Sequence, residues 1–433
     1  MKRPLNRVDL KGLEPLRDFL SFAPPSTASI EEQAAVQTLS SGWLATGPRC
    51  KSFEQVMARR LNVNDALAVS SCTAALHLAM RVIGLGPGQA FITTPLTFAS
   101  TAHAGAYLGA RPILADVSQD TGNLDPDKVK ELLRRDCSRG KDGRPVHNST
   151  GLTVSALVPV HYAGHPADLR ALWDIAAEYR LHVVEDAAHA LGTLYNNLPI
   201  GCHEHAPAKA FKKGLKNLCC FSFYATKNIT TGGDGGLLTS SDPELLEQAR
   251  RLSAYGISDG RRIWGRYSPQ GTWAYDVAEL GYKYNLTDIQ AAIGLAQMSK
   301  LDKFLKQRAQ RAMIWSHALW NLDKMVEMPA VREEACHSWH LFPLRIVPEA
   351  LAISRDQIIL ALKALNIETS VMFIPIHYHS YYREALGYEQ GDFPVAEDFF
   401  DREISLPVSP GSSLKSIRQA ADLLRRLLVR HAA

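Results

Sequence analysis

Short apolar runs alternate with helical patterns from residue 66 onward. We interpret the apolar runs as buried strands, because a strand covered on both faces of a sheet needs no polar side. Strands are predicted at residues 66–69, 90–93, 112–116, 154–159, 181–185, 218–224 and 237–239, and helices at 70–83, 98–107, 126–134 and 168–179. This order implies βαβ units, and therefore an α/β fold with a mainly parallel sheet and helices on both faces.

The pattern changes on either side of this block. Before it, helices are predicted at residues 29–39 and 51–61, with a loop at 40–48. After it, helical patterns run through residues 287–322, with a break expected near Lys303. A smaller α/β unit follows, with strands at 341–346 and 368–371, a helix at 354–365 and a last helix from about Ser413. We predict an N-terminal extension over residues 1–25, a large domain over 26–310 and a small C-terminal domain over 311–433.

Composition narrows the class of protein. The chain has 433 residues, 46% of them hydrophobic, and a net charge of +4, which gives no global sign of nucleic-acid binding. Its seven cysteines form no CxxC pair, which is typical of reduced thiols rather than of disulfides or a zinc site. No apolar run approaches the ~18 residues of a membrane span, and no secretory signal is visible. We expect a cytoplasmic protein with no metal, and with neither nucleic acid nor membrane as a partner.

Lys227 is the first candidate for chemistry. The strand predicted at 218–224 leads to it, and a segment rich in Gly and Thr follows. A lysine at the mouth of a buried sheet is easily desolvated, which lowers its pKa and makes it a plausible Schiff-base nucleophile. The alternative is a surface lysine in a hairpin loop.

Asp186 and His189 follow the strand predicted at 181–185. Ligands of open α/β sheets bind at this end of the strands, and a carboxylate there can keep the ring nitrogen of pyridoxal phosphate protonated. The alternative is an aspartate that caps the next helix. The residues around Thr73 open a helix and can bind an anion, although most such segments are ordinary caps. Phe98 can stack on a planar cofactor or belong to the core.

Two basic loops are further candidates for binding anionic groups. One carries Lys209, Lys212, Lys213 and Lys216, and the other carries Arg261, Arg262 and Arg266. Solvated surface charge is the alternative for both loops.

Five motifs in order resemble one family. They are residues 40–48 (SSGWLATGP), 71–77 (SCTAALH), 185–189 (EDAAH), 222–228 (SFYATKN) and 281–288 (GYKYNLTD). From about Phe22 to its end the chain is similar to the DegT/DnrJ/EryC1/StrS sugar aminotransferases, which are pyridoxal-phosphate-dependent enzymes of the aspartate-aminotransferase fold (fold type I). The resemblance implies an enzyme with a large cofactor-binding domain and a smaller C-terminal domain.

The resemblance also assigns roles to individual residues. Lys227 would carry the cofactor as a Schiff base and shuttle protons, and Asp186 would pair with the pyridine nitrogen. His189 would lie near the ring and Phe98 would stack on it. Thr73, Ala74 and Ser222 would hold the phosphate, and Asn285 would reach the phosphate of the neighbouring subunit. A homodimer with shared active sites is therefore implied.

The expected reaction is amination of a nucleotide-linked keto-sugar, with glutamate as donor. Asp234 lies seven residues after Lys227, a spacing similar to that of members that aminate C3 of the sugar. Residues 281–288 and 337–342 are closer to members that aminate C4, which we favour. The alternatives are a sugar dehydratase of the same fold, in which His replaces the lysine, and a relative that has lost turnover. The insertions at 136–150 and 203–217 have no assigned role.

Overall fold

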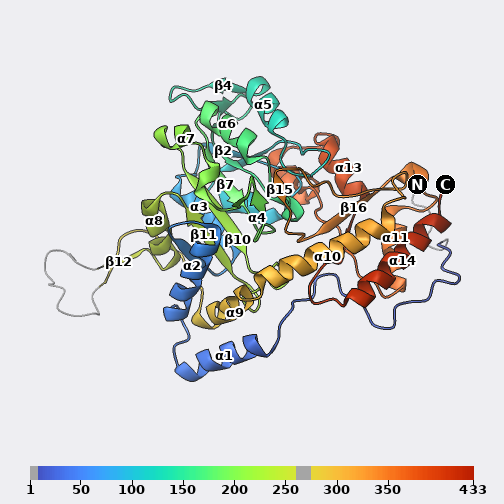
Figure 1. The fold of residues 1–433 in the computed structure, drawn as a ribbon. Coiled ribbons are helices and arrows are strands. Elements are labelled where there is room, and N and C mark those ends of the chain that lie inside the picture. The colour runs from blue at the N-terminus through green and yellow to red at the C-terminus, as the bar shows by residue number, and fades with distance from the viewer. Residues whose placement is uncertain (1–7, 260–274) are drawn as a thin grey trace.

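The computed structural model describes residues 8–259 and 275–433 (Figure 1). In these residues the main sheet has the strand order β1-β11-β10-β7-β6-β2-β3. In addition, β5 pairs with β6, and β4 pairs with β5. Only β11 on this path is antiparallel to its neighbours, so the predicted mainly parallel sheet is confirmed. The strands are β1 (Ala66–Val69), β2 (Gln89–Thr93), β3 (Arg111–Leu114), β4 (Cys137–Arg139), β5 (Pro145–His147), β6 (Thr153–Val158), β7 (His182–Asp186), β10 (Asn217–Ser222) and β11 (Gly236–Ser240).

Helices cover both faces of this sheet, because successive side chains of a strand point to opposite faces. On β7, Val183 packs into one hydrophobic core and Val184 into the other. One core is closed by α3 (Cys72–Val82), α4 (Ala99–Ala106) and α8 (Pro243–Ser253), and the other by α2 (Pro48–Leu61), α5 (Pro126–Arg135), α6 (Leu169–Tyr179) and the short α7 (Ala208–Lys212). The near-continuous apolar character of the strands follows from this double burial.

A long helix, α10 (Leu301–Leu319), runs from the large part of the molecule into the smaller one (Figure 1). Its Phe304 packs in a core of the large part, whereas Trp315 packs in the core of the small part. The predicted division between residues 310 and 311 thus falls inside one helix, and it stays a prediction.

The small part contains a three-stranded antiparallel sheet of order β14-β16-β17. Leu13, Leu16 and Leu20 of the N-terminal segment are buried in its core. The elements of this part are β14 (Val326–Glu327), β16 (Phe342–Ile346), α11 (Arg355–Ala364), α12 (Ser380–Leu386), α13 (Pro394–Arg402), β17 (Glu403–Leu406) and α14 (Leu414–Arg430). The N-terminal segment is therefore part of the small core.

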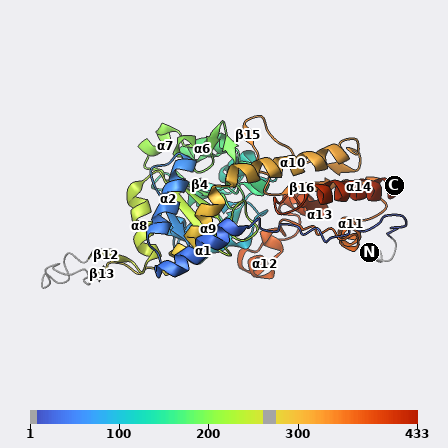
Figure 2. The same cartoon turned by 60° about the horizontal axis from the view of Figure 1, so that its bottom comes forward.

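Outside these cores, α1 (Ser29–Ser41) lies along α9 (Asp288–Met298) at the edge of the large part (Figure 2). A short sheet of β8 (Leu194–Tyr195), β9 (Leu198–Pro199) and β15 (Ala335–Cys336) links the two parts. The pair β12 (Ile257–Asp259) and β13 (Tyr275–Val277) forms a separate two-stranded sheet. Among the described helices, none combines the length and apolar character needed to cross a bilayer.

Three sequence predictions are wrong in detail. The strand predicted at 368–371 is absent, because this segment meets β17 only in an isolated bridge between Ser370 and Ser405. The helical break lies at residues 299–300 rather than near Lys303. The second helix begins at Pro48, three residues earlier than predicted, because Asp288 accepts hydrogen bonds from its first amides.

Candidate active site

A cavity of about 720 Å³ opens at the carboxyl ends of β7 and β10. Lys227, Asp186, His189 and Ser222 line it, together with Thr73 at the start of α3. These residues come from strands and loops far apart in the sequence, and the parallel sheet brings their ends to one edge. The cavity is therefore the candidate active site.

Lys227 follows β10 in a turn, where its backbone N–H donates to the carbonyl of Tyr224 at 2.9 Å. Burial lowers the pKa of the Lys227 ammonium to about 8, and the carboxylate of Asp186 opposes part of this shift. A larger fraction of this amine is therefore uncharged at neutral pH than of an ordinary lysine, as a nucleophile requires.

Asp186 ends β7 with both carboxylate oxygens engaged. Its Oδ2 accepts from the Thr101 hydroxyl at 2.7 Å, and its Oδ1 accepts from the Ala188 backbone N–H at 3.1 Å. Burial raises the pKa of Asp186, while these hydrogen bonds and the charge of Lys227 favour the ionised form. Asp186 is thus an oriented carboxylate within the cavity wall.

His189 is enclosed by aromatic rings. Its ring stacks on Phe373 with centroids 5.6 Å apart, and His340 lies on it at 4.3 Å. Burial, aided by the charge of Lys227, lowers the pKa of His189 well below its ordinary value, so the ring is neutral. Its buried Nδ1 has no hydrogen-bond partner among the described residues. An unpartnered buried polar atom in a cavity wall is suited to a polar ligand.

The amino end of α3 closes one side of the cavity. The first amides of a helix have no intrahelical acceptor and attract anions, and Thr73 lies in this first turn. Ala74, predicted to share this role, does not line the cavity, and its amide donates to Ser71 Oγ instead. A Cβ on Gly236 of β11 would approach the Ser71 backbone to 2.4 Å, so glycine lets the helix lie this close.

Phe98 stands at the rim with 63% of its surface exposed, and its ring faces Phe373 at 6.0 Å. Phe373 belongs to the strap, which we define as residues 371–374, and all four of its residues line the cavity. Phe22 of the N-terminal segment lines the same side. The sequence analysis assigned neither segment to the site, because neither carries a motif and residue 371 only ended a predicted strand. The packing of the small part brings them here.

Asn285 lies outside this cavity. Its side-chain amide donates to the Thr46 hydroxyl at 2.5 Å, and that hydroxyl in turn donates to the Leu286 carbonyl. Two of the motifs, residues 40–48 and 281–288, therefore pack against each other, and within one chain Asn285 is separate from Lys227.

The lysine loop also lies away from the cavity. Lys209 pairs with Asp174, Lys213 donates to the Ala177 carbonyl and Lys216 pairs with Asp242, which favours a structural role for these charges. None of the loop's lysines lines the cavity. Arg261, Arg262 and Arg266 lie outside the described residues.

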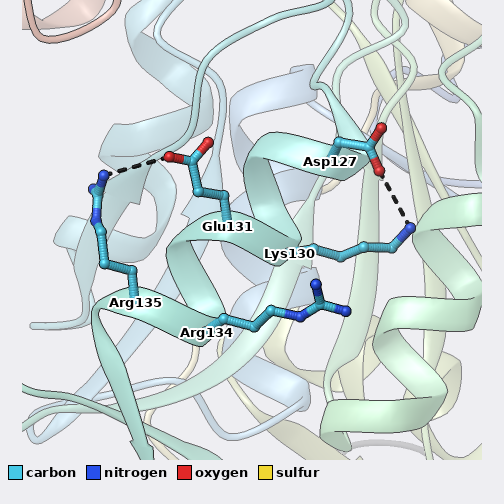
Figure 3. Close-up of a pocket in the computed structure, with 5 residues that line it drawn as sticks. All are labelled: Asp127, Lys130, Glu131, Arg134 and Arg135. Carbon is cyan, nitrogen blue, oxygen red and sulfur yellow. Dashed lines mark hydrogen bonds and ion pairs between the residues drawn. The ribbon is translucent and has the colours of Figure 1, made fainter.

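A second hollow, on α5, is lined entirely by charged side chains (Figure 3). Lys130 pairs with Asp127 and Arg135 pairs with Glu131, one helical turn apart in each case. Such pairs are typical of a solvated helix face, and this hollow lies on a different element from the candidate site.

A model of the DegT/DnrJ/EryC1/StrS aminotransferase family matches residues 25–425. The chain belongs to this family. The spore coat polysaccharide biosynthesis protein SpsC of Bacillus subtilis is 38% identical over 411 residues, which cover 95% of this chain and 97% of SpsC. The aminotransferase TlmJ from Streptoalloteichus hindustanus has a TM-score of 0.80 and 27% identity, over 95% of this chain and 99% of TlmJ. Spr1654 from Streptococcus pneumoniae, solved in its PLP form, has a TM-score of 0.80 and 26% identity, over 95% of this chain and 99% of its own.

The family establishes the enzyme class. The chain is a pyridoxal-phosphate-dependent aminotransferase of fold type I, from a family of sugar aminotransferases, so the predicted fold class, enzyme class and cofactor are confirmed. The cavity fits this cofactor, because it combines a lysine, a buried carboxylate, a helix amino end and the unpartnered His189 Nδ1.

Proposed function

We propose that this aminotransferase converts a nucleotide-linked keto-sugar to the amino sugar, with glutamate as amino donor. The observation that supports the proposal most directly is the grouping of Lys227, Asp186, Ser222 and the start of α3 around one cavity of about 720 Å³. This volume lies within the range of small-molecule sites, about 300–1,000 Å³. The similarity to SpsC, a spore coat polysaccharide biosynthesis protein, supports a sugar as substrate.

Pyridoxal phosphate supplies a carbonyl carbon that accepts an amine and a ring that withdraws electrons from the bond being broken. In our proposal Lys227 Nζ would hold the cofactor at that carbon and, once the amine of the donor has displaced it, would move a proton as general base and acid. Asp186 would hold the proton on the ring nitrogen, and the neutral His189 would lie near the ring, where its unpartnered Nδ1 could form a hydrogen bond. Phe98 covers one face of the ring. Thr73 and Ser222 would bind the phosphate directly, and Ala74, whose amide donates to Ser71 Oγ, would contribute only as part of the first turn of α3.

We favour amination at C4 of the sugar over C3. Residues 281–288 and 337–342 resemble members that act at C4 more than members that act at C3, and His340 of the second segment lines the cavity. Asp234, whose spacing favours C3, lines the cavity as well.

We also propose a homodimer whose active sites combine residues of both chains. Helix α1 buries the polar Glu31 and Thr38, and exposes Val36 at 60%, Leu39 at 54% and, just after the helix, Trp43 at 58%. A monomer rarely leaves such an apolar face open to water. Asn285 supports the same arrangement, since its Oδ1 is buried without a partner among the described residues.

The test is a screen of the purified protein against nucleotide-linked 4-keto and 3-keto sugars with glutamate, read by mass. We expect an amine product from a 4-keto sugar. The matched control is Lys227→Ala, which should show neither product nor the borohydride-sensitive cofactor absorbance. A loaded wild-type protein that aminates no nucleotide sugar but does aminate other ketones would refute the substrate, and turnover by Lys227→Ala would refute the role of the lysine.

A further inference from the structure

Thr101 is a buried residue of α4 that the sequence analysis did not single out. Its hydroxyl is fully enclosed and donates to Asp186 Oδ2 at 2.7 Å. A second hydroxyl, that of Thr97, lies 2.7 Å from Thr101 Oγ1. Thr97 lines the cavity, so the row of two hydroxyls runs from the cavity wall to the carboxylate.

The chemistry of the groups determines the direction of these hydrogen bonds. An ionised carboxylate only accepts, so the proton of Thr101 points to Asp186. The hydroxyl of Thr97 must then donate to Thr101. Hydrogen bonds in such a row polarise one another, which strengthens the bond at the charged end.

We propose that Thr101, supported by Thr97, is a positioning residue that keeps the Asp186 carboxylate ionised and directed at the ring nitrogen of the bound cofactor. The inference rests on the proposed role of Asp186. Beyond that role, Thr101 and Thr97 would be the groups that stabilise the ionised form of Asp186, which burial disfavours.

The surroundings of Asp186 show why this support is needed. Burial is the largest influence on the pKa of Asp186 and raises it, and the hydrogen bond from Thr101 is the largest influence in the opposite direction. The other groups that interact electrostatically with the carboxylate are Lys227 and His161, which favour its charge, and the thiols of Cys72, Cys219 and Cys220. Of these surroundings, Thr101 and the Ala188 amide give the carboxylate its direct hydrogen bonds.

Helix α4 also links this carboxylate to the cavity rim. Phe98 is the residue that caps the helix, and Thr101 lies one turn further along. The same turn therefore carries the ring at the rim and the hydroxyl on the carboxylate. A shift of this turn would move both groups together.

The test uses Thr101→Val, which removes the hydroxyl, and Thr101→Ser, which restores it, in the wild-type and Asp186→Asn backgrounds. Each protein is loaded with pyridoxal phosphate labelled with ¹⁵N in the ring, and the ring nitrogen is titrated by NMR. A charge-assisted hydrogen bond to the ionised carboxylate is worth ~1.5 kcal/mol, so we expect the pH midpoint at which Asp186 ionises, read through the ring nitrogen signal, to rise by about one unit in Thr101→Val. Thr101→Ser should return to the wild-type midpoint, and kcat of the valine variant should fall about tenfold.

The Asp186→Asn background distinguishes positioning from general packing. If Thr101 acts through the carboxylate, Thr101→Val should change the titration of the ring nitrogen little when Asp186 is already Asn. Thr93→Val is the matched control. Thr93 is equally buried, but its hydroxyl donates to the Val158 carbonyl rather than to Asp186. The midpoint measured in the Thr93→Val protein should therefore equal that of the wild type.

An unchanged midpoint in Thr101→Val, or equal shifts in both backgrounds, would overturn the proposal. Should the valine variant fail to fold, Thr97→Val replaces it, with a smaller shift in the same direction expected and no shift contradicting the inference. If Asp186→Asn alone leaves the ring nitrogen protonated, the proposed role of Asp186 fails, independently of Thr101.

Discussion

Lys227 and Asp186 influence each other at the scale of single residues. Burial lowers the pKa of Lys227 from 10.5 to about 8, and the carboxylate of Asp186 raises it. The uncharged amine becomes more abundant as the pH rises through the pKa of the folded protein. The reactivity of this lysine should therefore rise over a pH range about 2.5 units below that of a lysine in water.

Binding of pyridoxal phosphate to the cofactor-free protein should report this pKa. We expect the rate of adduct formation, followed by absorbance, to rise with pH and level off above about 8. Asp186→Asn removes the negative charge that stabilises the ammonium, so its midpoint should lie at lower pH. A midpoint near 10.5, or a shift to higher pH in Asp186→Asn, would contradict this account.

At the scale of elements, Asp288 holds α2 and α9 together. It begins α9 with its carboxylate buried, and the carboxylate accepts from the amides of Gly47, Arg49 and Cys50 at the start of α2. A negative charge at a helix amino end is stabilised by unpaired amides and by the helix dipole. The motif residue Asp288 therefore has a structural role, as a cap supplied by another helix.

Asp288→Ala should lower the free energy of unfolding by about 3 kcal/mol, because it leaves buried amides without an acceptor. Urea denaturation at neutral pH measures this loss. The control is Asp302→Ala on α10, whose carboxylate pairs with Arg60 at the surface and should contribute less than about 1 kcal/mol. Equal losses in the two variants would show that the interhelical cap contributes no more than a surface ion pair.

At the scale of the whole molecule, the position of Asn285 bears on the proposed dimer. It packs on Thr46, outside the cavity that contains Lys227 of the same chain. A role for Asn285 at the cofactor phosphate therefore requires the cavity of a second chain.

Mixing two inactive variants tests this arrangement. In a heterodimer of Lys227→Ala and Asn285→Ala, one shared site carries both changes and the other carries neither. Activity should therefore rise well above that of either parent, up to about a quarter of the wild-type level when exchange is random, since half of the dimers are mixed and each has one intact site. Mass spectrometry of the intact dimers is the control for subunit exchange. Proven exchange without recovered activity would mean that each site is built from one chain.

The sequence by itself determined the alternation of strands and helices, the mainly parallel sheet and the grouping of Lys227, Asp186 and His189, and its resemblance to the family added Ser222. Local patterns suffice for these, because double burial makes strands apolar and the topology of a parallel sheet brings their carboxyl ends together. The segment rich in Gly and Thr after Lys227 could also be recognised from the sequence.

Only the tertiary structure decided which other groups complete the site. Thr101, the strap and Phe22 reach the cavity through packing between segments distant in sequence, for which the chain carries no local signal. Packing between distant segments also explains why the strand predicted at 368–371 does not form. It likewise pairs Lys209 and Lys216 of the lysine loop with Asp174 and Asp242. Strand formation and ion pairing depend on the partner that the fold supplies, and that partner is fixed only when the whole chain is packed.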